Sequence, residues 1–370
     1  MLIWIDPSVL TADLATDHDS CNGISEIFAA VYRGEHYAVG TRDTLVALAQ
    51  NQNLSSVTRT TIATIQVNLP LLGAINSQIG TRIKVTHGGA ATCRQVTTAE
   101  WEVPLREIGI RGIKKALILT ENLNDAKAYE QAAKQYQVSI GMTGQVALER
   151  AGGGGSTTSD AFENHANIEK RWSLCITDSD RICPADNMDT MAQKCNGIAS
   201  SNTNVASHVD LTAREIENIL PIVFLAKAIP PTHQELWDWH MNKLYKLRSD
   251  AHFYCDIKEG ITFKKILSYP ANTNRRVYWD SVVTDLKQAT ALTSGCIDIG
   301  ECKQDNNTPC QCYVTNGFGP KILESVIEQL DNQSAHQAET QTRRDPNRKP
   351  WMDIGHIVFE WGCAPLKTRL

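Results

Sequence analysis

Two short apolar runs, each followed by acidic residues, dominate the hydrophobic pattern of the chain. The first run covers residues 116–120 and is followed by Glu121, and the second covers residues 172–177 and is followed by Asp178 and Asp180. Continuous apolar runs of this length are typical of parallel strands that are buried on both faces. The carboxyl ends of parallel strands meet at one edge of an open sheet, where ligands bind. We therefore expect these three acids to converge at that edge.

Weaker patterns on either side of these runs predict the rest of the fold. Residues 160–171 fit a helix that returns the chain to the second strand, as parallel strands require. Residues 252–260 predict a further short strand that carries Lys258. We expect an α/β protein in three parts. They are a small N-terminal α/β unit of unknown role at residues 1–112, a central domain with a mostly parallel, Rossmann-like sheet at 113–230, and a C-terminal α+β extension at 231–370.

The acids that follow the two runs predict a divalent-metal site. Crowded carboxylates repel one another unless a cation neutralises them, and their oxygens suit a hard ion such as Mg²⁺. Further along the chain, Thr212 and Glu215 have the spacing of a capping box, which explains Glu215. Glu217 has no such explanation. Lys258 is either a solvated surface lysine or a group that offsets charge on a metal-bound phosphate.

A second acidic group lies near the N-terminus, after the first predicted strand. It contains Asp6, Asp17, His18 and Asp19. Some nucleases gather acids in such a place, but aspartate is also a usual residue of turns and helix caps, and the capping interpretation is favoured.

The glycine run at residues 152–155, followed by Ser156, has two interpretations. Its composition fits a flexible linker. It also fits a loop whose backbone approaches a phosphate closely, because glycine has no Cβ and permits positive φ. Since the run lies between two predicted strands of one sheet, we favour the loop. Its phosphate-binding residues would be Gly153, Gly154, Gly155 and Ser156.

Composition and charge narrow the class of protein. The chain has 370 residues, of which 42% are apolar and 21% charged, as in ordinary globular proteins. No apolar run approaches the ~20 residues that span a bilayer, and the N-terminus does not resemble a signal peptide, so we expect a cytoplasmic protein that does not enter a membrane. The net charge of −5 argues against a broadly basic nucleic-acid-binding surface but permits a local basic channel.

Eleven cysteines are scattered through a chain that is too large to need disulfide cross-links, which favours reduced thiols or a metal site. Four of them fall within seventeen residues. These four, Cys296, Cys302, Cys310 and Cys312, are candidate ligands of a structural Zn²⁺, although their spacing contains no C-x-x-C pair.

The order of motifs in the centre of the chain resembles the TOPRIM domain of topoisomerases, bacterial primases and OLD-family nucleases. The resemblance covers about residues 113–225 and consists of a strand-terminal glutamate, a helix, a glycine-bearing strand and a strand ending in Asp-x-Asp. Glu121 followed by Asp125 is similar to the paired acids of OLD-type nucleases and their standalone relatives in phage defence. Residues 214–218, Arg-Glu-Ile-Glu-Asn, are similar to a segment of those proteins. Asn122 stands where the family usually has glycine.

The resemblance implies a metal-dependent nuclease that cleaves DNA or RNA in bacterial anti-phage defence. Glu121, Asp178 and Asp180 would hold one Mg²⁺ or Mn²⁺ ion, Asp125 and Glu217 a second, and Lys258 would face the scissile phosphate. Relatives often act with an ABC-type ATPase, which here would be encoded separately because the chain lacks the motif G-x-x-x-x-G-K-S/T.

Three points stay open from the sequence. A non-catalytic TOPRIM-like assembly or sensor protein, which binds nucleic acid or an ATPase partner, is the first alternative function. A nucleotide-binding domain that uses the glycine run is the second. The assembly state is also undecided, although a homodimer is the commonest one.

Overall fold

A computed structural model of the chain describes all residues except 70–74, 76, 202, 293–294, 303–309 and 368–370. The chain forms two compact units. Unit 1 contains Met1–Ile176, Lys194–Val209 and Met352–Leu370, and unit 2 contains Thr177–Gln193 and Asp210–Trp351. Among the described residues, no helix has both the length and the apolar character needed to cross a bilayer.

Sheet A of unit 1 has five strands in the order β2-β1-β3-β5-β4, and all neighbours are parallel except β4 and β5. The strands are β1 (Leu2–Ile5), β2 (Tyr37–Gly40), β3 (Arg82–Thr86), β4 (Arg94–Thr97) and β5 (Glu100–Pro104). The helices of this part are α1 (His18–Tyr32), α2 (Arg42–Gln50), α3 (Ser56–Val67) and α5 (Leu105–Arg111). Asp6 accepts a hydrogen bond from the Ser8 amide and Asp17 one from the Ser20 amide, which confirms the capping interpretation of these acids.

Helices α1 and α5 cross at two glycines. A Cβ added to Gly109 would overlap the backbone carbonyl of Asp19, and one added to Gly23 would overlap that of Leu105. Neither obstacle is a flexible side chain, so the two backbones approach closely only because both positions lack a Cβ.

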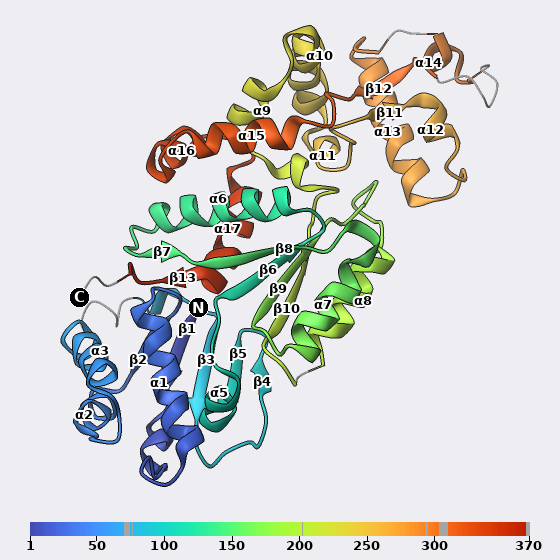
Figure 1. Ribbon diagram of the computed structural model, residues 1–370. Coiled ribbons are helices and arrows are strands. Elements are labelled where there is room, and N and C mark those ends of the chain that lie inside the picture. Colours follow the sequence, from blue (N-terminus) through green and yellow to red (C-terminus); the bar gives the residue numbers. More distant parts are fainter. Residues whose placement is uncertain (70–74, 76, 202, 293–294, 303–309, 368–370) are drawn as a thin grey trace. The chain divides into compact units, whose positions relative to one another are not determined.

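Sheet B has four strands in the order β10-β9-β6-β8, and β6 pairs in parallel with both β8 and β9 (Figure 1). The strands are β6 (Ala116–Thr120), β8 (Leu148–Gly152), β9 (Ser173–Thr177) and β10 (Ala206–Asp210). β6 and β9 are fully buried, as their continuous apolar sequences predict. The parallel-rich sheet A and the parallel sheet B confirm the predicted α/β class.

The connections of sheet B place a topological switch point between β6 and β9. The chain leaves β6 through α6 (Leu123–Ser139) to β8 on one side, then passes through α7 (Thr158–Glu163) to β9 on the other. Helix α6 therefore lies along one face of the sheet, and α7 with α8 (Thr190–Ala199) lies along the opposite face (Figure 1). The crossover helix predicted at residues 160–171 is present as α7 and the π-helical segment Asn164–Ile168 that continues it, so helical structure begins at Thr158 and ends at Ile168.

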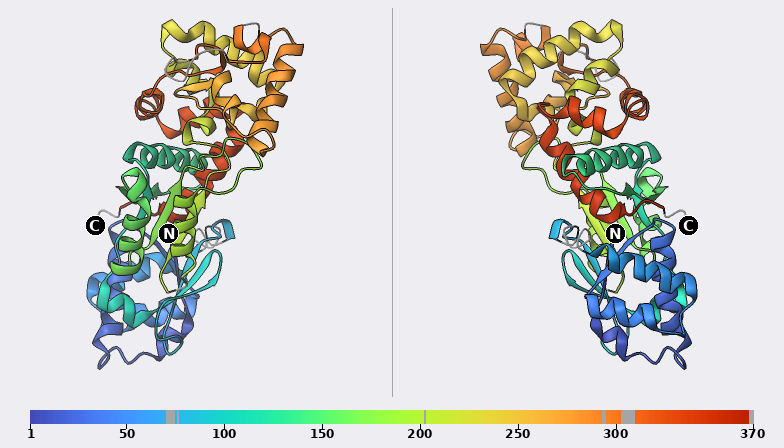
Figure 2. Two further views of the ribbon diagram at one scale, coloured as in Figure 1. Left: turned by 90° about the vertical axis from the view of Figure 1, so that its right-hand side faces the viewer. Right: turned by 90° about the vertical axis from the view of Figure 1, so that its left-hand side faces the viewer.

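The C-terminal helix α17 (Arg348–Gly362) returns to unit 1 and runs beside α6 (Figure 2). A Cβ on Gly355 would lie 2.6 Å from the Ala132 carbonyl of α6. After α17, β13 (Cys363–Ala364) pairs with β7 (Gln145–Val146), and the N-terminal amine donates to the Cys363 carbonyl over 2.8 Å. The first residue of β1's segment and strand β13 therefore lie in contact within unit 1.

One buried carboxylate joins α17 to the start of β3. Glu360 accepts hydrogen bonds from the Gly80 amide at 2.5 Å and the Thr81 hydroxyl at 2.6 Å, and its Oε1 lies 3.1 Å from His356 Nε2. The hydrogen bond to Glu360 is the main cause of a raised pKa at His356.

We predict that Glu360→Gln lowers the pKa of His356 toward its ordinary value near 6.5. A raised folded-state pKa stabilises the protein fully below the unfolded value, and this contribution is lost as the pH rises through the folded value. Urea unfolding of the parent should therefore show the contribution at pH 6 and its loss above the folded pKa. The imidazole resonances in NMR give the pKa directly, and an unchanged value in Glu360→Gln would contradict the assignment.

Unit 2 is mostly helical, with one small antiparallel strand pair. The strands are β11 (Gly260–Thr262) and β12 (Tyr313–Asn316). The helices are α9 (Ile222–Ala228), α10 (Gln234–Trp239), α11 (Ser249–His252), α12 (Phe263–Leu267), α13 (Asn274–Gln288), α14 (Gly295–Ile299), α15 (Ile322–Asp331) and α16 (Ala335–Thr342). The described part of the unit also contains the 3-10 turns η4 (Ile216–Ile219) and η5 (Pro231–His233) and the π-helical segment His240–Tyr245.

The predicted strand at residues 252–260 is wrong. Helix α11 ends at His252 and β11 begins only at Gly260. Between them Asp256 Oδ1 accepts hydrogen bonds from the Lys258 amide at 3.0 Å and the Glu259 amide at 2.7 Å. An aspartate that binds the amides two and three residues ahead stabilises a turn, so Lys258 projects from a turn instead of a strand.

Candidate metal site

The carboxyl ends of β6 and β9 form the switch point of sheet B. Thr120 of β6 is in register with Ile176 of β9, and both strands run in the same direction. Glu121 follows the first strand directly, and Asp178 follows the second. Open α/β sheets bind ligands in the crevice at such a point, as the sequence pattern predicts.

Asp125 helps to cap the N-terminus of helix α6 in unit 1. Asn122 is the N-cap of α6, and its side chain accepts a hydrogen bond from the Asn124 amide at 3.0 Å. Asp125 Oδ2 accepts one from the Asn122 amide, also at 3.0 Å, which completes a capping box. Asn122, the departure from the TOPRIM pattern, is thus explained by helix capping. The role of Asp125 as a metal ligand stays a prediction.

The glycine run packs against the end of β6. The amide of Gly153 donates to the Thr120 carbonyl at 2.7 Å, and those of Gly154 and Gly155 donate to the Glu121 carbonyl at 3.1 and 3.4 Å. Gly154 and Gly155 have φ values of +75° and +64°, which favour glycine. A phosphate would have to displace these hydrogen bonds, so the geometry gives the run, with Ser156 after it, a structural role between β8 and α7.

Asp178 begins an acid cluster in unit 2. Its Oδ1 accepts a hydrogen bond from the Ile216 amide at 3.2 Å. The amides of Ser179 and Asp180 both donate to the Arg214 carbonyl at 3.1 Å. Asp180 has a φ of +51°, an uncommon value for a residue other than glycine. These hydrogen bonds fix the Asp-x-Asp turn beside residues 214–216.

Two cations pair with the acids of the cluster. Arg214 lies 3.1 Å from Glu215 Oε1 through its Nε and 3.1 Å from Asp256 Oδ2 through its Nη2. Lys258 Nζ lies 2.8 Å from Glu215 Oε2 and 3.5 Å from Glu217 Oε1. Its raised pKa reflects attraction to Glu217, Glu215 and Asp178, which outweighs burial. The lysine predicted to face a phosphate is therefore directed at carboxylates.

The cluster contains more negative than positive charge. Its carboxylates are Asp178, Asp180, Glu215, Glu217 and Asp256, and its cations are Arg214 and Lys258. Five carboxylates and two cations leave a formal charge of −3. A divalent cation would reduce this imbalance, and oxygen ligands suit Mg²⁺ or Mn²⁺.

Glu217 is the most informative member of the cluster. It is 4% exposed, and its Oε2 has no hydrogen-bond partner. Burial raises the pKa of Glu217, Lys258 opposes that rise, and the charge of Glu215 adds to it. A buried carboxylate oxygen without a partner is costly, and a bound cation is one way to satisfy it.

Reasoning from sequence identified Asp178, Asp180, Glu217 and Lys258 of this cluster but missed Arg214, Glu215 and Asp256 as its members. Thr212 does not cap a helix through Glu215. Instead Glu215 is itself the N-cap of η4, paired with Asn218. The predicted capping box was wrong because the helical turn begins at Ile216, four residues after Thr212.

All eleven cysteines lie in the described part of the chain, and all are free. Three of the four predicted zinc ligands converge, since the sulfur atoms of Cys296, Cys302 and Cys310 lie within 4.8 Å of one another. A second group that sequence reasoning missed, His240, His252 and Cys255, is fully buried in unit 2. Burial lowers the pKa of His252 to about 4, so this imidazole is neutral.

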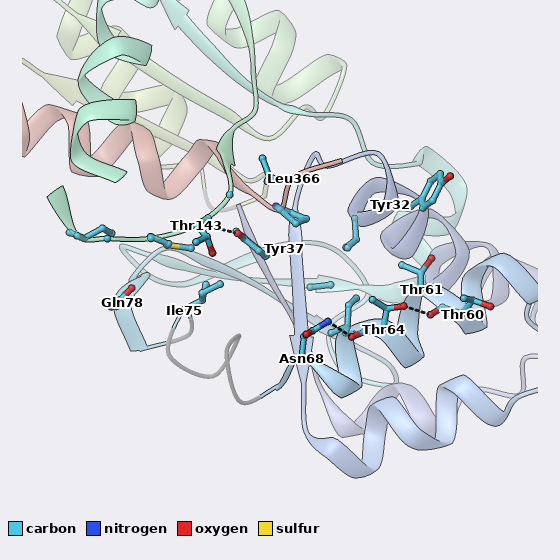
Figure 3. Close-up of a pocket in the computed structure, with 18 residues that line it drawn as sticks. Tyr32, Tyr37, Thr60, Thr61, Thr64, Asn68, Ile75, Gln78, Thr143 and Leu366 are labelled. Carbon is cyan, nitrogen blue, oxygen red and sulfur yellow. Dashed lines mark hydrogen bonds between the residues drawn. The ribbon is translucent and has the colours of Figure 1, made fainter. Parts of the chain in front are cut away.

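A pocket of about 570 Å³ in unit 1 differs in chemistry from the acid cluster (Figure 3). Its lining is apolar apart from hydroxyl and amide groups such as those of Tyr37, Thr64 and Asn68. No carboxylate, histidine, cysteine or charged amine is among its lining residues. Its lining residues therefore offer none of the carboxylate, imidazole or thiol ligands that commonly bind metal ions.

Comparison with known proteins adds no assignment to this geometry. No family model, no curated protein and no solved structure matches the chain.

Proposed function

We propose that this chain is a divalent-metal-dependent nuclease that hydrolyses phosphodiester bonds in DNA or RNA. One observation carries the proposal: among the described residues, five carboxylates gather around Arg214 and Lys258, and the buried Oε2 of Glu217 has no hydrogen-bond partner. The cluster begins at Asp178, directly after a parallel strand, which is the usual location of ligand sites in α/β folds.

The donor atoms of the cluster are of the kind that a divalent ion prefers. Among the described residues, however, no three of these acids have ligand oxygens that all lie within 4.8 Å of one another, so a bound ion would have to draw the carboxylates together. Asp178, Asp180 and Glu217 supply oxygen ligands, which Mg²⁺ and Mn²⁺ prefer. An ion bound there supplies an activated water and offsets charge on the leaving oxygen. Lys258 then has a second task, because Nζ can turn from the carboxylates to a phosphate oxygen and stabilise the negative charge that develops on it.

Glu121 enters the proposal through the resemblance to TOPRIM domains, which implies that Glu121 binds the same ion as Asp178 and Asp180, while Asp125 and Glu217 bind a second ion. Glu121 is the first residue after β6.

The biological setting rests on the resemblance to TOPRIM domains and OLD-type nucleases. On that basis the chain is an effector of bacterial anti-phage defence and acts in the cytoplasm. Its partners would be nucleic acid and a separately encoded ABC-type ATPase, with a homodimer as the expected assembly.

A non-catalytic role is the second candidate, and one observation favours it. Lys258 and Arg214 already form ion pairs with Glu215, Glu217 and Asp256. Such a network can fix the fold without a metal ion. In that case the chain would be a TOPRIM-like assembly or sensor protein that binds nucleic acid or an ATPase partner.

The test is incubation of the purified protein with plasmid DNA and with total tRNA, in Mg²⁺, in Mn²⁺ and in excess chelator. Metal-dependent cleavage of either polymer supports the nuclease and identifies its substrate. Nucleic-acid binding without cleavage, in protein that binds no Mn²⁺, supports the non-catalytic role.

Lys258→Met separates the two roles of this lysine. We predict that cleavage falls by about 10²-fold, since the charge that stabilises the transition state is lost. Mn²⁺ should bind at least as tightly as in the parent, because a competing cation has left Glu215 and Glu217. Calorimetry measures the binding and gel assays the cleavage. Loss of Mn²⁺ binding in a folded Lys258→Met protein would contradict this role.

A further inference from the structure

Three cysteines of unit 2 bring their sulfur atoms together from separate elements. Cys296 lies in α14, Cys302 follows that helix, and Cys310 precedes β12. The three sulfur atoms lie within 4.8 Å of one another, and those of Cys302 and Cys310 are 3.7 Å apart.

This spacing matches thiolates that share a metal ion. Zinc binds thiolate sulfur at about 2.3 Å in a tetrahedron, which places two sulfur ligands about 3.8 Å apart. A disulfide requires a sulfur–sulfur distance of about 2.05 Å. The observed 3.7 Å between Cys302 and Cys310 therefore agrees with zinc thiolates and not with a disulfide.

The sulfur of Cys310 is surrounded by hydrogen-bond donors. These donors are the backbone amides of Cys312 and Lys264 and the thiols of Cys302 and Cys296. Amide groups that donate to a sulfur ligand are typical of the outer shell of metal sites, where they orient the ligand.

Cys312 is the candidate for the fourth ligand. Its sulfur lies outside the group of three that fall within 4.8 Å of one another, so its side chain would have to turn toward them to complete a tetrahedron. Its sulfur is 3.4 Å from the position that a Cβ on Gly295 would occupy, and Gly295 is the neighbour of Cys296. We propose that Cys296, Cys302, Cys310 and Cys312 bind one structural Zn²⁺ ion. The proposal goes beyond the nuclease and does not depend on it.

The zinc ion would stabilise the strand pair β11–β12, which lies next to Lys258 in the chain. The Phe263 amide donates to the Cys312 carbonyl at 2.8 Å, directly before β12 pairs with β11. Beyond β12 the Gly319 amide donates to the Lys258 carbonyl at 3.0 Å. Zinc therefore joins α14 to the same strand pair that holds the backbone of Lys258.

The test is the zinc content of protein purified under reducing conditions without chelator. We expect one zinc per chain in the parent and none in Cys302→Ser or Cys310→Ser. Cys255→Ala is the matched control, since Cys255 belongs to the other possible ligand group of unit 2 and should leave the zinc in place. A chelator should lower the melting temperature of the parent but not that of Cys302→Ser.

Cobalt substitution of the parent keeps the proposal testable if the serine variants fail to fold. Tetrahedral Co²⁺ with thiolate ligands gives strong charge-transfer absorption in the near ultraviolet. In Cys312→Ser this intensity should fall by about a quarter, since three of four thiolates remain. Zinc-free parent protein that also gives no such absorption would overturn the proposal. So would zinc that survives in Cys302→Ser, or zinc that is lost in Cys255→Ala.

Discussion

Asp178→Asn is expected to reduce metal-dependent cleavage by about 10³-fold, which corresponds to ~4 kcal/mol of transition-state stabilisation. Asparagine keeps the oxygen that accepts the Ile216 amide at 3.2 Å, so the turn after β9 should hold its shape. What the substitution removes is one negative charge and one ligand for a divalent cation. The measurement is the initial rate of cleavage of a labelled substrate in Mg²⁺ and Mn²⁺.

Asp186→Asn is the matched control for this prediction. Asp186 Oδ2 accepts a hydrogen bond from the Ile182 amide at 2.8 Å, and the carboxylate pairs with Arg275 at 2.9 Å. It therefore combines backbone capping with charge, as Asp178 does. Asp186 lines one pocket with Asp180, but its charge is paired with Arg275 and not with the cations of the acid cluster. Its cleavage rate should stay within about twofold of the parent. Equal losses in both variants would show that the effect of Asp178→Asn is structural.

Gly109→Ala is expected to destabilise unit 1 by about 3 kcal/mol, because the added methyl group overlaps the Asp19 carbonyl where α5 crosses α1. The obstacle is backbone, so relief requires the two helices to separate. For a unit of this size the melting temperature should fall by roughly 10 °C, as measured by calorimetry or circular dichroism.

Gly197→Ala provides the comparison for the helix crossing. Gly197 lies in α8, and a Cβ there would meet no heavy atom within 4 Å. Alanine is the better helix former, so this variant should gain up to ~1 kcal/mol. If Gly109→Ala melts at the temperature of Gly197→Ala, the close approach of α1 and α5 is not present in solution.

Some strands of sheet B can be predicted from the sequence, and others cannot. Residues 116–120 and 172–177 are recognisable because burial on both faces requires continuous apolar side chains. β8 is harder to recognise, since Glu149 and Arg150 interrupt its apolar pattern at the edge of the sheet. Strand order also needs the structure, because pairing β6 with both β8 and β9 depends on contacts between distant segments.

The acid cluster shows the same difference between local patterns, which the sequence reveals, and contacts between distant segments, which it does not. Asp178 and Asp180 follow a strand, so a local pattern identifies them. Arg214 and Asp256 are joined by an ion pair across more than forty residues, and no local pattern contains that information. Asp256 also accepts the hydrogen bonds that form the turn at Lys258, and this turn is why the strand predicted there is absent.

The proposed zinc ligands are a third example of a site that the sequence predicts only in part. Four cysteines within seventeen residues predict a cluster, but their spacing lacks the C-x-x-C pair of common zinc sites. The sulfur atoms of Cys296, Cys302 and Cys310 converge because α14 and the segment before β12 lie next to each other, which only the tertiary structure reveals.

The central claim is that the acids of unit 2 bind a divalent cation, and titration of Mn²⁺ into the parent by isothermal calorimetry tests it most directly. We predict saturable binding that is lost in Asp178→Asn and kept in Asp186→Asn. Absence of Mn²⁺ binding in the parent, or equal binding by the Asp178→Asn protein, would contradict the claim.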